Sequence, residues 1–165
     1  MLSFYFCGTN AVDFYYLKKN NIKSGRLEYK RAKINGKRKD QAFISIKIVT
    51  EAERLLNKYI GKLRVRFSSH TRLSTVLSQG LWRIQKGVEI PDVTFYWAHH
   101  SFATLARNAC RKSKDDITMA LNRIDEGRKT TDIYIQKDRT IVDEVQSAVL
   151  DLINNYTENN ILTMA

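Results

Sequence analysis

The sequence has few of the residues that cross-link a chain or bind metal. Its 165 residues include two cysteines, Cys7 and Cys110, and three histidines. Two cysteines this far apart are too few for a zinc cluster or for the disulfide framework of a secreted domain. No H-x-x-x-H or H-E-x-x-H pair occurs, so no metal site is expected. These absences favour a reduced, cytoplasmic location.

Long hydrophobic runs are also absent. No apolar stretch approaches the ~20 residues that a membrane-spanning helix needs, so no membrane partner is expected. The opening MLSFYFCG has neither the charged region nor the cleavage site of a signal peptide. With one proline and ordinary proportions of hydrophobic (43%) and charged (27%) residues, residues 1–165 should form a single domain. The uncapped start indicates a natural chain that begins upstream, with its first helix truncated here.

Acidic residues are scarce relative to basic ones. The chain carries 28 Lys and Arg against 17 Asp and Glu, a net charge of +11. Such a charge attracts polyanions. The basic residues are densest from Lys18 to Lys39, where ten Lys and Arg accompany one acid, Glu28. This stretch is either a solvated hairpin or a strand laid against DNA phosphates, and its tight clustering around Tyr29 favours DNA.

Residue periodicity predicts a mainly helical α+β fold. Residues 26–34 and 41–48 alternate in polarity on either side of Asn35-Gly36, which predicts a β-hairpin with a basic tip and hence a small antiparallel sheet. Thr50 and Glu53 match a capping box at the start of a helix. Core-facing helices are further expected over residues 2–7, from residue 71, and over 97–110, 113–122 and 140–154.

Two motifs carry candidate chemistry. WAHHSFATLARNACR, residues 97–111, has His99 and His100 in the first turn of a helix, where histidines are more often capping or packing groups than catalysts. TMALNRIDEGRKTTDIYI, residues 118–135, has a short helix, a polar turn and then Tyr134. Taken singly, that tyrosine is a core or interface aromatic in most proteins.

In their order and spacing, these motifs resemble the catalytic domain of the tyrosine recombinases, the phage integrase family. HSFATLA, ALNR and TTDIYI resemble the second conserved box, H-x-x-R-H-[ST]-F-A-[ST], A-L-G-H and T-T-x-x-Y. FCGTNAVDFYYLKKNNI resembles the first box, and YKRAKI resembles the strand that bears a catalytic lysine. The sequences of these motifs are most similar to those of integrases of Bacteroides-type mobile elements. The resemblance implies a helical recombinase catalytic domain whose amino-terminal core-binding domain lies outside this sequence.

The resemblance also implies roles for individual residues. Tyr134 falls on the nucleophile that forms a 3′-phosphotyrosyl intermediate, Lys33 on the general acid, and His100 on the histidine of the second box. The expected DNA contacts are basic residues of the hairpin: Lys30, Arg31, Lys37, Arg38 and Lys39. The implied reaction is DNA integration or site-specific recombination on double-stranded DNA. It needs no cofactor, because the phosphotyrosine linkage conserves the energy of the broken bond.

The family's enzymes work as tetramers on DNA and exchange their carboxy-terminal segments. The helix expected over residues 140–154 is a candidate for that docking, and packing on its own domain is the alternative. The isolated fragment is expected to be a monomer.

Four positions depart from the family pattern. Asn10 and His99 stand where arginines are usual, and Tyr96 and Arg123 where histidines are usual. Arginine forks normally bind the charge that develops on the attacked phosphate, and losing one such donor costs about 10²–10³ in rate. Asn10 offers only a weaker, neutral hydrogen bond.

Three interpretations follow. The preferred one is an active site in which Lys33, His99 and Arg123 bind the phosphate. The second is a DNA-binding or regulatory relic of the family. The third is an unrelated basic nucleic-acid-binding module, which explains the charge and leaves the order of the motifs to coincidence.

Overall fold

The computed structural model describes residues 1–32, 42–123 and 138–163, apart from the side chains of residues 158 and 160–163. It is mainly helical with a small three-stranded antiparallel sheet, which confirms the predicted fold class. The chain forms two compact units, Met1–His100 (unit 1) and Ser101–Ala165 (unit 2). The single domain expected from the sequence stays a prediction.

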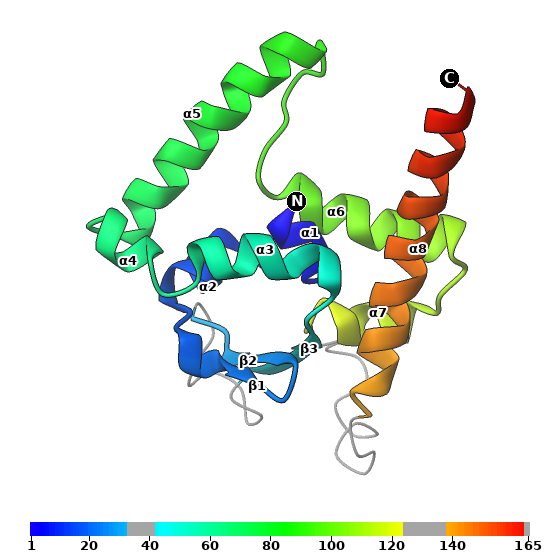
Figure 1. Cartoon of the computed structure of the whole chain (residues 1–165), viewed down its shortest axis with the longest axis horizontal. Coiled ribbons are helices and arrows are strands. Elements are labelled where there is room, and N and C mark those ends of the chain that lie inside the picture. The colour runs from blue at the N-terminus through cyan, green and yellow to red at the C-terminus, as the bar shows by residue number, and fades with distance from the viewer. Residues whose placement is uncertain (33–41, 124–137, 164–165) are drawn as a thin grey trace. The chain divides into compact units, whose positions relative to one another are not determined.

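Unit 1 begins with short helices, continues through the sheet and ends with longer helices (Figure 1). Its elements are α1 (Leu2–Tyr5), α2 (Ala11–Tyr16), the 3-10 turn η1 (Lys19–Asn21), β1 (Ile22–Lys23), β2 (Arg26–Lys30), β3 (Phe43–Lys47), α3 (Thr50–Tyr59), α4 (Leu63–Arg66), α5 (His70–Val88) and the start of α6 (Trp97–Thr104).

The sheet follows the predicted hairpin and adds one strand. β2 pairs antiparallel with β3, with Leu27 opposite Ile46 and Tyr29 opposite Ile44, and all four side chains are buried. Because alternate residues of a strand share a face, this register places the apolar side chains on one side of the sheet. The two-residue strand β1, which the sequence did not indicate, pairs with the start of β2. The predicted hairpin tip, residues 33–41, lies outside the described residues.

Helix α3 contributes Ala52 and Leu56 to the buried core of unit 1. Its start differs from the prediction, because Val49 is the N-cap residue, Thr50 is already helical, and no side chain caps the helix. The capping box predicted from Thr50 and Glu53 is therefore wrong. The Thr50 hydroxyl cannot play that part, because a capping side chain must precede the first helical residue.

Helix α5 forms where the sequence places it, but its apolar stripe is not buried within unit 1. Ser69 caps it by accepting a hydrogen bond from the backbone N–H of Arg72 (3.1 Å). Among the described residues only Leu73 of this helix is buried, while Trp82 and Ile84 are more than half exposed. The expectation of a core-facing helix is therefore wrong beyond its first turn. Periodicity shows which residues share a face, and not what packs against that face.

The described part of unit 2 contains the rest of α6, the π-helical turn η2 (Leu105–Ala109), α7 (Lys114–Ala120) and α8 (Thr140–Thr163). The first half of α8 packs against α7 and η2, which buries Val142, Val145 and Val149, as the sequence predicted. Leu152, expected on the same buried face, is 36% exposed. The second half of α8 runs beyond the helix predicted over 140–154.

Candidate functional site

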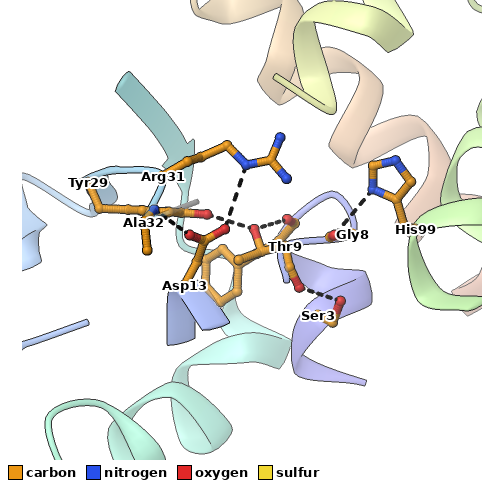
Figure 2. A network of polar contacts seen from close by, with 9 residues as sticks. Ser3, Gly8, Thr9, Asp13, Tyr29, Arg31, Ala32 and His99 are labelled. Atoms are coloured by element: carbon orange, nitrogen blue, oxygen red, sulfur yellow. Dashed lines mark hydrogen bonds and ion pairs between the residues drawn. The ribbon is translucent and has the colours of Figure 1, made fainter. Parts of the chain in front are cut away.

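Three segments that are distant in sequence meet in unit 1. They are the turn from Gly8 to Asn10, the carboxyl end of β2, and the first turn of α6. Figure 2 shows the polar contacts that join them. These are also the segments that carry the predicted site residues Asn10, Lys30, Arg31, His99 and His100.

Asp13 ties α2 to the end of β2. Its Oδ1 accepts a hydrogen bond from the backbone N–H of Ala32 (2.9 Å), and its Oδ2 lies 3.6 Å from Nε of Arg31. The Asp13 side chain is only 2% exposed, and that of Arg31 is 14% exposed. Burial raises the pKa of Asp13, and the Ala32 N–H and the Arg31 guanidinium oppose that rise only in part. The position of Ala32 matters because Lys33 is the next residue of the chain.

A second contact joins the turn to the interior of β2. The Thr9 hydroxyl donates to the carbonyl of Phe6 (2.7 Å), which uses its one hydrogen. The Tyr29 hydroxyl, 3.0 Å from Thr9 Oγ1, must therefore be the donor in that pair. Burial strongly raises the pKa of Tyr29, so its phenol stays neutral. The backbone carbonyl of Thr9 also accepts from Ser3 Oγ (2.7 Å), which fixes the turn on α1.

His99 joins the first turn of α6 to the same turn of the chain. Its Nδ1 lies 3.3 Å from the carbonyl oxygen of Gly8, and because that oxygen can only accept, Nδ1 carries the hydrogen. The approach needs a glycine, since a Cβ on Gly8 would lie 2.6 Å from Cα of His99. The φ of +73° at Gly8 also favours glycine. On its other side the His99 ring stacks on Tyr96, with centroids 5.0 Å apart.

Several predicted site residues lie in or beside this network. Asn10 is half-buried as the N-cap residue of α2, without a side-chain capping bond. His99 is buried, whereas His100 is exposed with its ring edge-on to Tyr96. Arg31, predicted to contact DNA, is partly buried and paired with Asp13, while Lys30 is exposed at the end of β2.

The other predicted residues are not brought to this site by the described structure. Lys33, Lys37, Arg38, Lys39 and Tyr134 lie outside the described residues. Arg123 is exposed in unit 2, where its backbone N–H donates to the carbonyl of Thr118 (2.9 Å) after α7. Their assigned roles stay predictions.

A comparison with models of protein families, with curated proteins and with solved structures finds no match to this chain. Within the described ranges, no group of three or more His, Cys, Asp or Glu side chains could hold a metal ion. In the same ranges, no helix is long and apolar enough to cross a membrane. The function of this chain therefore has to be inferred from its own residues.

The sequence interpretation gave no role to Asp13 or Thr9, and it used Tyr29 as an aromatic residue that favours DNA contact. In the structure Tyr29 is buried and bonded to Thr9, so its ring is part of the core of unit 1. Asp13 could have been found, because it is the only charged residue in the otherwise apolar run from Ala11 to Leu17. A lone carboxylate on a buried helix face needs partners, since burying an unpaired charge is costly. Its partners Arg31 and Ala32, just after β2, could not be identified from spacing alone.

Two glycines give a matched test of the contact between Gly8 and His99. Gly8 and Gly25 share a φ of +73°, but nothing lies within 4 Å of a Cβ built on Gly25. Alanine at either position incurs the left-handed strain of about 1–2 kcal/mol. Gly8→Ala should lower the free energy of unfolding in urea by about 1–3 kcal/mol more than Gly25→Ala, because its methyl group must displace the backbone of His99. Equal losses would show that the close approach does not exist.

The raised pKa of Asp13 predicts a defined pH dependence. Between the ordinary pKa of an aspartate, about 3.9, and the raised folded-state value, the folded protein binds more protons than the unfolded chain. Stability contributed by this group therefore falls as pH rises through that window. Asp13→Asn removes the titration, so the unfolding free energy of the wild type minus that of the variant should decrease with rising pH. An increase would mean that Arg31 and Ala32 outweigh burial.

Proposed function

We propose that this chain is the catalytic domain of a tyrosine-type site-specific DNA recombinase, which cuts and rejoins double-stranded DNA through Tyr134. The observation that carries the proposal is the meeting of three distant segments through Asp13, Tyr29 and His99. An unrelated basic module would have no reason to join the same three segments that resemble the family's motifs. The net charge of +11 supports DNA as the substrate.

The proposed reaction is a transesterification, in which one phosphoester bond forms as another breaks. The Tyr134 phenol loses its proton to solvent water as its oxygen attacks a backbone phosphorus, the P–O5′ bond breaks, and a 3′-phosphotyrosine forms. Lys33 gives its proton to the leaving 5′ oxygen, which becomes a free hydroxyl. Rejoining is the reverse, with the 5′-hydroxyl attacking the phosphotyrosine.

The site must also stabilise charge that develops on the phosphate oxygens. In this proposal Lys33, His99 and Arg123 supply that stabilisation, with Asn10 and His100 as further hydrogen-bonding groups. Asp13 acts as a positioning residue. Its bonds to Arg31 and to the N–H of Ala32 fix the strand end from which the chain continues into Lys33.

The proposed function also implies that several copies of the protein assemble on DNA. The full-length protein is proposed to form synaptic tetramers on DNA, with α8 as the exchanged segment. Two exposed apolar side chains support this role for α8: Leu152 is 36% exposed and Tyr156 is 72% exposed.

The covalent intermediate gives the decisive test. Full-length protein incubated with a nicked suicide DNA substrate should yield a protein–DNA adduct that resists denaturant. Tyr134→Phe should abolish the adduct, because it removes the attacking oxygen and little else. Tyr59→Phe is the matched control, since this tyrosine of α3 has no assigned role in cleavage or assembly and its variant should leave the adduct unchanged. DNA binding without any adduct would favour the relic, in which the fold binds DNA but no longer cleaves it.

The role of Lys33 can be separated from that of Tyr134 by changing the leaving group. Lys33→Ala should slow cleavage of ordinary DNA by about 10²–10⁴. A substrate with sulfur at the bridging 5′ position leaves as a thiolate that needs no proton, because thiols are acidic, with pKa values of about 8.5. The variant and the wild type should cleave that substrate at similar rates. An equal loss on both substrates would exclude Lys33 as the general acid.

A further inference from the structure

A second basic surface lies in unit 1, on residues that the resemblance did not assign to DNA. It is formed by five exposed side chains, which we call the basic corner: Lys18, Lys19, Lys62, Arg64 and Arg66. The first two follow α2, and the others belong to the connection between α3 and α5. In Figure 1, α4 lies beside the end of α2.

Backbone contacts hold these two segments together. The N–H of Gly61 donates to the carbonyl of Leu17 (3.1 Å), directly before Lys18. A Cβ on Gly61 would lie 4.0 Å from the backbone nitrogen of Lys19. The Tyr15 hydroxyl donates to the carbonyl of Phe67 (3.2 Å), just after Arg66. The two segments are therefore fixed as neighbours at both ends of α4.

The charge of the corner is not neutralised locally. From Arg54 to Val88 the chain has eight Lys and Arg and no Asp or Glu. On the neighbouring α2 the one acid is Asp13, which is buried and paired with Arg31. Within the described part of the chain, none of the five corner side chains forms an ion pair. Uncompensated, clustered positive charge of this kind is what raises the local concentration of a polyanion.

One of the corner arginines is held in place. The guanidinium carbon of Arg64 lies 5.6 Å from the centre of the Tyr16 ring. Tyr16 is in turn packed edge-to-face against Tyr15, with ring centres 5.0 Å apart. A planar guanidinium ordered by an aromatic face loses less freedom when it binds, and its fork of N–H donors matches phosphate oxygens.

We infer that the basic corner binds the sugar–phosphate backbone of double-stranded DNA, as a contact surface made of residues other than those assigned to the reaction. Phosphate recognition by ordered guanidinium groups favours nucleic acid. An anionic membrane also attracts basic residues but is held by inserted apolar surface, and Val65 is the only strongly exposed apolar side chain of α4. The partner is the one in the proposed function, but the inference does not require that Tyr134 reacts.

The test compares two pairs of charge removals in the full chain carrying Tyr134→Phe, so that no covalent adduct contributes. Arg64→Gln/Arg66→Gln removes two charges from the corner. Arg83→Gln/Lys86→Gln removes two from the far part of α5. Binding to a duplex of arbitrary sequence is followed by fluorescence anisotropy over a series of salt concentrations, with circular dichroism to check folding.

The corner pair should reduce the slope of log affinity against log salt by about 1.8, since each phosphate contact contributes about 0.9. The α5 pair should leave the slope close to that of the parent. Equal changes in both pairs would mean that only total charge matters, and no change in either would mean that the corner makes no contact. Vesicles of phosphatidylserine and phosphatidylcholine form a second arm, and corner-dependent binding to them without binding to DNA would also overturn the inference. A missing Tyr134 adduct would defeat the proposed reaction and leave this result standing.

Discussion

A buried carboxylate is costly unless its environment supplies donors, and the described site is built around one such group. Asp13 lies on α2 with almost no exposure to solvent, and the groups that compensate it come from the end of β2. Folding therefore requires that α2 and the sheet meet in one register. The turn before α2 is fixed in the same way, through Thr9 to Tyr29 and through Gly8 to His99.

This arrangement separates two uses of positive charge. Arg31 is partly buried and forms an ion pair with Asp13, although it belongs to the most basic stretch of the sequence. Lys30, one residue earlier, and the five residues of the basic corner remain at the surface. A count of basic residues therefore overstates the charge available to DNA near β2. Such a count also does not single out α4, a four-residue helix that carries two exposed arginines.

Local sequence patterns predicted the helices and strands better than they predicted which elements pack together. The alternation of residues 26–34 and 41–48 predicted the pairing of β2 with β3, and the valines of α8 predicted its buried face. The stripe on α5 predicted a helix but not its exposure, because periodicity carries no information about what lies opposite. For the site, the motifs identified His99 and the turn at Asn10. The contact between His99 and Gly8 spans 91 residues, and no local rule encodes a contact at that separation.

The sheet has one further consequence. Among the described residues β3 is an edge strand, because the order is β1, β2, β3. An open edge offers unpaired backbone groups to a strand from another molecule, which is a common route to aggregation. Here that edge is five residues long and ends at the exposed Lys47. Its shortness and its terminal positive charge both disfavour the addition of a foreign strand, so two copies of this chain have little tendency to join through their sheets.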